Sequence, residues 1–172
     1  LRHAVRRRCG VYAGGVERQL NADDFMRIAL EEGLLALPAC LPNPPVGCVL
    51  VRNGEVIARG HTQEPGNDHA EAMALRRVRG DLPDVTAYVS LEPCSFHGRT
   101  PSCARALIDR RVGRVVVALL DPDRRNDGAG IQMLRDAGIE VSVGVLEREA
   151  RANLAPYLAL AANGGPEQSR LG

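Results

Sequence analysis

The 172-residue sequence contains no lysine and no tryptophan, and aromatic residues make up only 3% of it. Because all 22 basic residues are arginine, the chain cannot supply a Schiff-base lysine or the phosphate-binding lysine of nucleotide hydrolases. No apolar run approaches the roughly eighteen residues that span a bilayer, and the arginine-rich start is not followed by the apolar stretch of a secretory signal. The sequence therefore predicts a cytoplasmic protein with no membrane partner.

Charge is nearly balanced over the chain but unevenly distributed along it. The formal net charge is +1, and residues 1–20 carry five arginines against one glutamate, so the remaining residues sum to −3. A mildly acidic body with few aromatic side chains offers neither a basic groove nor a stacking surface for single-stranded nucleic acid. We therefore expect no nucleic-acid partner.

Length and near-average composition indicate one folded domain with irregular ends. Residues 1–20 mix arginine and glycine without periodicity, and we expect them to form a flexible leader. The periodic segments all fall within residues 21–162, which we expect to form the domain. Residues 163–172 are rich in small and polar residues and are predicted to form a flexible tail.

Hydrophobic periodicity predicts one helix, a hairpin and three helix–strand units. The pair Asn53-Gly54 between two apolar runs is typical of a two-residue hairpin turn, and Asn21 or Asp23 could cap the first helix. The last two strands should run parallel, because a full helix separates them. The fold class is therefore α/β, a three-layer α/β/α sandwich around a five-stranded mixed sheet. The expected helices cover residues 23–36, 69–79, 102–111 and 129–137, and the expected strands cover residues 46–51, 55–59, 86–91, 114–120 and 139–146.

One histidine and two of the five cysteines have the residue types of a catalytic zinc site. His69, Cys94 and Cys103 would supply three ligands and leave the fourth position of Zn²⁺ open for water. His69 falls in the first turn of its expected helix, and both cysteines occupy loop-to-helix positions where unpaired N–H groups favour a thiolate. Zn²⁺ is therefore the expected cofactor. The other three cysteines, Cys9, Cys40 and Cys48, are interpreted as small structural side chains, since an odd count without a secretory signal argues against disulfides.

Glu71 lies two residues beyond His69, and positions i and i+2 of a helix point in different directions. We therefore expect Glu71 to reach the water on the metal instead of binding the metal. Zinc lowers the pKa of its bound water, so that hydroxide can attack an amine-bearing ring carbon while a carboxylate carries the proton to the departing amine. A His-x-Glu followed by Pro-Cys-x-x-Cys is the signature of zinc deaminases. Here eight residues separate the two cysteines instead of two.

The sequence LEPCSFHGRTPSC at residues 91–103, taken with His69-Ala70-Glu71 and with PNPPVG at residues 42–47, resembles the deaminase domain of a known family. This is the bifunctional pyrimidine deaminase/reductase of riboflavin biosynthesis, and the resemblance covers about residues 23–160. The long insert ending in Thr-Pro-x-Cys separates this family from cytidine and transfer-RNA deaminases. The resemblance implies a cytidine deaminase-like fold, zinc on the three residues above and Glu71 as proton shuttle. Because no reductase sequence follows, we expect a stand-alone or divergent member.

The resemblance also implies a small aminopyrimidine substrate, either the diaminopyrimidinone ribosylamino phosphate of riboflavin biosynthesis or a related heterocycle. Asn43 would contact the pyrimidine ring, and Arg99 would face the ribose phosphate with two donors. His97 would either bond the substrate or pack over the loop, and Asp121 is the fourth expected substrate contact.

Three departures from the family pattern lie on the expected phosphate side of the substrate. Phe96 stands where a histidine is expected. Thr62 stands where many members carry histidine, which is displaced here to His61. The residues DPDRR at 121–125 replace the usual Asp-Pro-Asn-Pro.

Two other functions compete with this interpretation. The first is a nucleic-acid editing deaminase, which the acidic body disfavours. The second is a catalytically silent paralogue that keeps zinc for stability and acts as a partner subunit, which the presence of Glu71 disfavours. The apolar flank at residues 155–162 could pack against a second copy, so a homo-oligomer is compatible with the sequence.

Overall fold

The computed structural model describes residues 18–96 and 101–162. His97 and Arg99, two expected substrate contacts, lie outside the described residues. So do residues 163–172 and most of residues 1–20, and their flexibility stays a prediction. No helix among the described residues is both long enough and apolar enough to cross a membrane.

Five strands form one mixed sheet in the order β2-β1-β3-β4-β5. β1 runs antiparallel to both β2 and β3, whereas β3, β4 and β5 run parallel. The expected five-stranded mixed sheet with a parallel last pair is therefore confirmed. The elements in chain order are α1 (Ala22–Leu34), β1 (Gly47–Arg52), β2 (Glu55–His61), α2 (Ala70–Arg76), β3 (Val85–Val89), α3 (Cys103–Asp109), β4 (Arg114–Val117), α4 (Ala129–Asp136), β5 (Glu140–Val143) and α5 (Glu147–Ala162).

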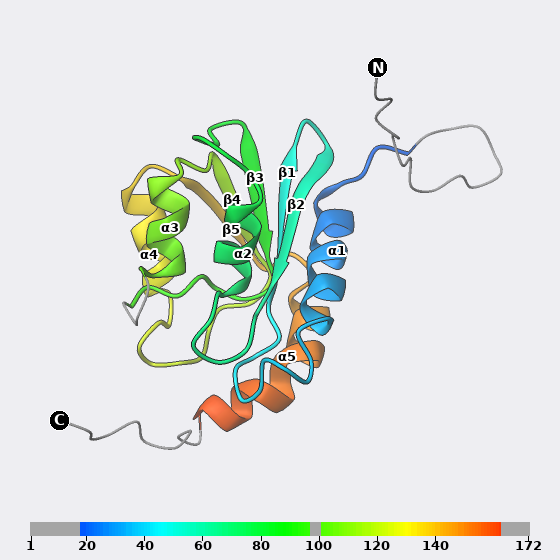
Figure 1. Ribbon diagram of the computed structural model, residues 1–172, viewed down its shortest axis with the longest axis vertical. Helices are drawn as coiled ribbons and strands as arrows, with labels where there is room; N and C mark the ends of the chain where they lie inside the picture. The colour runs from blue at the N-terminus through cyan, green and yellow to red at the C-terminus, as the bar shows by residue number, and fades with distance from the viewer. Residues whose placement is uncertain (1–17, 97–100, 163–172) are drawn as a thin grey trace.

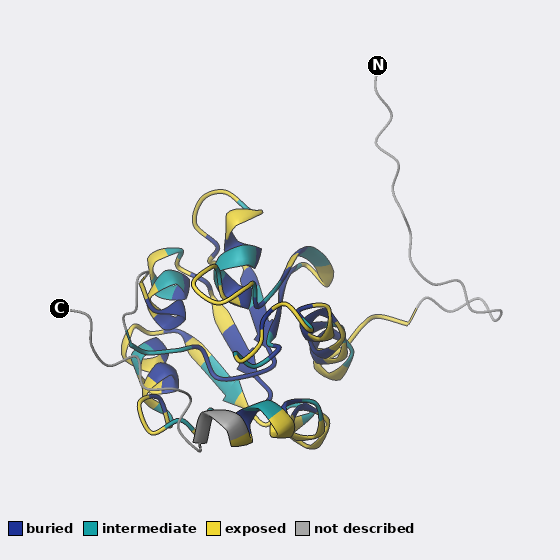
Figure 2. Ribbon diagram, turned by 60° about the horizontal axis from the view of Figure 1, so that its bottom comes forward, coloured by how far each residue is buried: buried dark blue, intermediate teal, exposed yellow. Residues whose placement is uncertain are grey.

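Helices cover both faces of this sheet, which confirms the three-layer α/β/α arrangement (Figure 1). α2, α3 and α4 pack on one face, and α1 and α5 pack on the other. Side chains of β1 alternate between the two, because successive residues of a strand point to opposite faces. Cys48 and Leu50 join the core under α2, α3 and α4, whereas Val49 and Val51 join the core under α1 and α5. The sheet between the layers is mostly buried (Figure 2).

The first helix begins with a capping box that resolves which residue caps it. The Asn21 side chain accepts a hydrogen bond from the backbone N–H of Asp24 at 3.0 Å, and the Asp24 carboxylate accepts one from the backbone N–H of Asn21 at 2.9 Å. Two otherwise unpaired donors are satisfied in this way. Asn21 is therefore the cap, and the helix starts one residue earlier than expected.

α5 was not expected from the sequence. It runs for 16 residues with Pro156 inside it, and it packs Ala150, Leu154 and Leu158 against the sheet. Leu158 belongs to the apolar flank that was expected to meet a second copy. Part of that flank is therefore used within the domain.

Candidate metal centre

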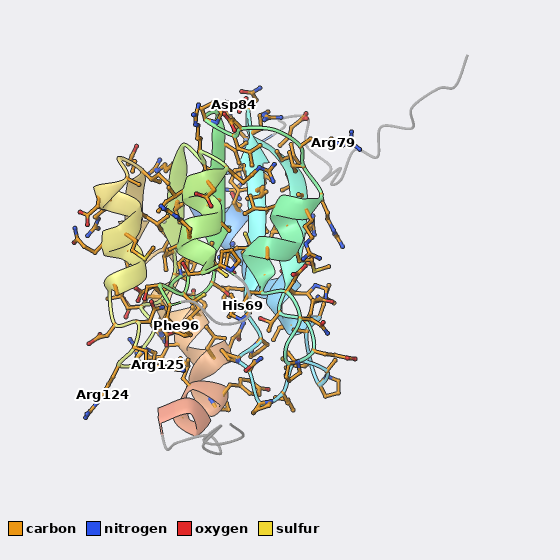
Figure 3. The ribbon with its side chains drawn as sticks, turned by 60° about the vertical axis from the view of Figure 1, so that its left-hand side comes forward. His69, Arg79, Asp84, Phe96, Arg124 and Arg125 are labelled. Atoms are coloured by element: carbon orange, nitrogen blue, oxygen red, sulfur yellow. The ribbon has the colours of Figure 1, made fainter. Side chains whose placement is uncertain are left out.

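His69, Cys94 and Cys103 come together at the edge of the sheet where β3 and β4 end. His69 is the N-cap of α2, Cys103 is the first residue of α3, and Cys94 lies in the loop after β3. The start of α2 rests directly on β2, because a Cβ added to Gly60 would lie 2.2 Å from the Ala70 carbonyl oxygen. Figure 3 shows His69 near the middle of the view, well away from Arg79 and Asp84 near the top.

The three ligand atoms have the spacing that zinc requires. His69 Nδ1 lies 3.7 Å from Cys94 Sγ and 3.4 Å from Cys103 Sγ. Zinc bonds of about 2.0–2.1 Å to nitrogen and about 2.3 Å to sulfur at tetrahedral angles place N and S about 3.6 Å apart. All three atoms lie within 4.8 Å of one another. The residues therefore fit the ion without rearrangement.

Burial leaves one side of this cluster open to solvent. Cys103 is buried, Cys94 is half-buried and His69 is exposed. No fourth histidine, cysteine or carboxylate joins the cluster in the two described stretches of the chain. Among the described residues, the candidate site therefore offers three protein ligands, one of which is exposed to solvent.

The pKa values of the candidate ligands favour a charged thiolate at Cys94 and a charged imidazolium at His69. Hydrogen bonding to Cys103, and then to His69, lowers the pKa of the Cys94 thiol to about 4. The hydrogen bond to Cys94 raises the pKa of His69 to about 9. The backbone N–H of Cys103 also donates to Cys94 Sγ at 3.2 Å. A thiolate is the form of cysteine that binds metals, and the start of α3 favours it at Cys94.

Glu71 stands beside the cluster, and its part in the reaction stays a prediction. Its side chain is only 3% exposed, and this burial raises the pKa of its carboxyl group. The charges of Cys94 and His69 act on the same carboxyl in opposite directions. The Cys103 side chain also acts on this carboxyl, so Glu71 lies within reach of all three candidate ligands.

Glu92 is a functional residue that the sequence reasoning missed. Its buried carboxylate accepts four backbone N–H groups: Oε2 accepts from Asp121 and Gly128, at 3.1 and 3.0 Å, and Oε1 accepts from Gly130 and Ile131, at 3.0 and 3.3 Å. These contacts join the Cys94 loop to the start of α4. An acidic residue inside the apolar run 85–93 was the available signal.

Asn43 lies at the same edge of the sheet, and its contact with substrate stays a prediction. It is half-buried in the loop before β1. β1 is fixed beside the end of β3, because the Gly47 N–H donates to Ser90 Oγ at 3.0 Å and the Ser90 N–H donates to the Gly47 carbonyl. Thr62 Oγ1 holds the loop by donating to the Pro44 carbonyl at 3.0 Å.

The side chain of Asp121 is occupied by its own loop. Oδ1 accepts from the Asp123 N–H at 3.0 Å, and Oδ2 accepts from Asn126 Nδ2 at 3.3 Å. Burial raises the pKa of this carboxyl. The structure thus gives Asp121 a clear part in shaping the loop, and its substrate contact stays a prediction.

The departures from the family pattern form contacts of their own. His61 Nδ1 lies 2.8 Å from the carboxylate of buried Glu32, so the displaced histidine is paired inside the domain. The Arg125 guanidinium lies over the Phe96 ring, 4.5 Å from its centroid, and Figure 3 shows the two side chains together. Such a cation–π contact suits an aromatic ring better than a charged histidine.

Known proteins are similar to this chain in sequence and in fold. A sequence model of the cytidine and deoxycytidylate deaminase zinc-binding region matches residues 20–119, more than half of the chain. The riboflavin biosynthesis protein RibD of Chlamydia pneumoniae is 48% identical over 134 residues, which are 78% of this chain and 36% of that protein. The chain spans about a third of the length of the curated relatives it matches.

Solved structures agree with the sequence match. Acinetobacter baumannii RibD superposes with a TM-score of 0.77 at 40% identity, over 84% of this chain and 41% of that one. A Thermotoga maritima diaminohydroxyphosphoribosylaminopyrimidine deaminase/5-amino-6-(5-phosphoribosylamino)uracil reductase superposes with a TM-score of 0.77 at 38% identity, over 82% and 41%. With its cluster of one histidine and two cysteines inside the matched region, the chain belongs to the cytidine and deoxycytidylate deaminase zinc-binding family, in which it is similar to the RibD proteins.

Proposed function

We propose that this domain hydrolytically deaminates a small aminopyrimidine, with zinc held by His69, Cys94 and Cys103. The observation that carries the proposal is the cluster of three ligand atoms within 4.8 Å, beside which the Glu71 carboxyl is buried. A purely structural zinc site is usually closed by a fourth protein ligand, whereas a catalytic one keeps that position for water. The buried acid beside an open position supports catalysis over a stabilising role.

The proposed reaction assigns one task to each of these groups. When bound, zinc would lower the pKa of a coordinated water enough to supply hydroxide at neutral pH. Glu71 would accept the proton of the attacking water and deliver it to the leaving amine. Water adds to the amine-bearing ring carbon, the C–N bond breaks, and ammonia leaves as the ring carbonyl forms. The backbone N–H of Cys103 would hold the Cys94 sulfur in place throughout.

We further propose that the substrate is the diaminopyrimidinone ribosylamino phosphate of riboflavin biosynthesis or a closely related heterocycle. The similarity to RibD proteins supports this class, and the Thermotoga protein is a diaminohydroxyphosphoribosylaminopyrimidine deaminase/reductase. Asn43 would contact the ring, Arg99 the phosphate, and His97 and Asp121 the rest of the substrate. Phe96 contacts Arg125, and His61 contacts Glu32, at positions that depart from the family pattern. These contacts would influence which heterocycle of this substrate class binds best.

The proposed cellular location and binding partners are those expected from the sequence. We propose a cytoplasmic enzyme whose partner is the small-molecule substrate, with no nucleic-acid or membrane partner. A homo-oligomer is part of the proposal, because large apolar side chains such as Leu34, Leu35 and Leu41 are exposed near the end of α1.

Ammonia release from a matched pair of substrates tests the proposal. Zinc-loaded protein should release ammonia from the diaminopyrimidine ribosylamino phosphate, and the same riboside without its 5′-phosphate should react at least about tenfold more slowly, because an arginine–phosphate contact contributes roughly 1.5–3 kcal/mol. Equal rates would remove Arg99 and the phosphorylated substrate from the proposal. Zinc-loaded protein that is inert towards all aminopyrimidines tried would favour the silent partner subunit. Ammonia release from single-stranded nucleic acid instead would favour the editing deaminase.

A further inference from the structure

The side chain of Asn126 holds the peptide groups on both sides of Cys94. Asn126 Nδ2 donates to the Pro93 carbonyl at 3.3 Å, and Asn126 Oδ1 accepts from the Ser95 N–H at 3.0 Å. The side chain is buried, with 2% of its surface exposed. Asn126 comes from the loop between β4 and α4, 32 residues further along the chain than Cys94.

Cys94 needs such support more than the other two candidate ligands do. His69 and Cys103 sit at the starts of α2 and α3, whose helical backbone fixes where each side chain begins. Cys94 lies in an irregular segment, and among the described residues its carbonyl accepts a hydrogen bond from the Ala104 N–H alone, at 3.1 Å. The position of its sulfur therefore depends on what holds the neighbouring peptides.

An amide side chain can make both contacts at once. Its oxygen accepts and its nitrogen donates, whereas a carboxylate only accepts and an aliphatic side chain does neither. The second hydrogen of Asn126 Nδ2 points to Asp121 Oδ2 at 3.3 Å, which fixes the orientation of the amide. A carboxylate at this position would face the Pro93 carbonyl and the Asp121 carboxylate, and it would have no hydrogen to donate to either of them.

The rest of the α4 loop supports the same segment. The Glu92 carboxylate binds the N–H groups at the start of α4, and Ser95 Oγ donates to the Arg125 carbonyl at 3.4 Å. These contacts keep Asn126 within reach of Pro93 and Ser95. They do not replace its two hydrogen bonds, which are the ones that reach the peptides on either side of Cys94.

We propose that Asn126 is a positioning residue of the metal centre, acting on zinc through the Cys94 sulfur. It touches neither the metal nor the substrate. The proposal rests on Cys94 being a zinc ligand, as in the proposed function, and it does not depend on which pyrimidine reacts. Groups that orient metal ligands in other proteins typically raise metal affinity about 10- to 100-fold, which sets the size of the expected effect.

Metal-binding measurements on two variants test this inference. Asn126→Asp keeps the shape of the side chain and loses the donor to Pro93, whereas Asn126→Ala loses both contacts. Zinc affinity is measured by competition with a chromophoric chelator. The visible spectrum of the Co²⁺-loaded protein reports the geometry and the number of thiolate ligands. Both variants should bind zinc about 10- to 100-fold more weakly, with weaker thiolate-to-cobalt absorption per bound ion.

A core variant separates positioning from general loss of stability. Leu134→Ala removes a fully buried side chain of α4 without touching the Cys94 loop. It should lower the unfolding midpoint while leaving zinc affinity and the cobalt spectrum of the folded protein unchanged. If Asn126→Ala does not fold, the near-isosteric Asn126→Asp carries the test alone.

The inference would be overturned if the Asn126 variants kept zinc affinity and thiolate-to-cobalt absorption within about twofold of the unchanged protein. It would also be overturned if Leu134→Ala lowered both quantities as much as the Asn126 variants do. Neither readout needs a substrate. Failure to release ammonia with normal metal binding would therefore count against the proposed function and not against Asn126.

Discussion

Gly130 approaches Pro93 so closely that a Cβ added to it would lie 2.0 Å from the Pro93 carbonyl oxygen. Only glycine lets α4 pack onto the segment that carries Cys94. The Gly130 N–H also donates to the Glu92 carboxylate at 3.0 Å. Gly130 of α4 therefore contacts both a backbone carbonyl and a side chain of the segment that carries Cys94.

Gly130→Ala is therefore expected to push the Cys94 segment away from α4. Overpacking of this kind costs about 1–3 kcal/mol of unfolding free energy. Zinc affinity should fall with it, because the displaced carbonyl precedes a candidate ligand. Urea unfolding and chelator competition measure the two effects. Gln132→Ala, at an exposed position of the same helix, should change stability by less than about 0.5 kcal/mol, and an equally mild Gly130→Ala would refute the close approach.

Glu92→Gln should destabilise the protein by about 2–6 kcal/mol. The amide nitrogen cannot accept hydrogen bonds, so two of the four backbone N–H groups that Glu92 now satisfies would be left buried without a partner, at about 1–3 kcal/mol each. The midpoint of urea unfolding measures this loss. Glu149→Gln, on the exposed face of α5, is the matched control and should have almost no effect. Equal midpoints for the two variants would show that the four contacts add no stability.

Glu71→Gln should keep zinc and lose deamination. The glutamine fills the same buried space but cannot carry a proton, and positioned acid–base groups contribute roughly 10²- to 10⁴-fold to rates. Metal content by elemental analysis and ammonia release are measured on the same preparation. Turnover within a few-fold of the unchanged protein would remove Glu71 from the reaction.

Cys103→Ala should lose the metal and much of the stability of the fold. Cys103 is buried at the start of α3, where it meets both His69 and Cys94. Cys48→Ala is the matched control, because Cys48 is equally buried but belongs to the core under α2, α3 and α4. It should keep about one zinc per chain, and loss of zinc from Cys48→Ala alone would contradict the assignment of ligands.

Removal of zinc should expose Cys94 to alkylation while the protein stays folded. Cys94 is half-buried beside the open side of the cluster, whereas Cys40 and Cys48 are fully buried. Peptide mass spectrometry after brief treatment with iodoacetamide, with and without chelator, reports each cysteine separately. Cys94 should react quickly only after chelation, and Cys40 and Cys48 should stay unlabelled in both samples. Rapid labelling of Cys94 in the zinc-loaded protein would mean that it does not bind the metal.

Local features of the fold could be predicted because they depend on neighbouring residues. Asn53-Gly54 does form the hairpin turn, with φ of 51° and 75° at its two residues, and both residue types tolerate that left-handed conformation. Strand ends were less predictable. The apolar run 114–120 was expected to be strand throughout, but β4 ends at Val117. Ala118 and Leu119 are buried and still bond to Val89 and Glu92 through their backbone, but outside the regular strand. Apolar residues report burial and not hydrogen bonding.

α5 could not be predicted because its apolar stripe is narrow. Ala150, Leu154 and Leu158 recur every four residues, the first of them among charged residues, and Pro156 interrupts the pattern. A single row of this kind is weak as a helical signal. Only its packing on the sheet shows that the segment belongs to the fold.

The candidate ligands were predictable, and the residues that hold them were not. Histidine, cysteine and glutamate have side chains whose chemistry marks a metal site wherever they occur. Asn126 and Glu92 act through ordinary hydrogen bonds to backbone groups 29–39 residues away in sequence, and such contacts exist only after the chain has folded. Only the acidic residue type within an apolar run pointed to Glu92, and nothing in the sequence pointed to Asn126.

X-ray absorption at the zinc edge of the loaded protein tests the central claim most directly. The account predicts two sulfur neighbours at about 2.3 Å, one imidazole nitrogen at about 2.0 Å and one further oxygen that exchanges with added ligands. A first shell completed by a third sulfur or a second imidazole, or one with fewer than two sulfurs, would contradict it.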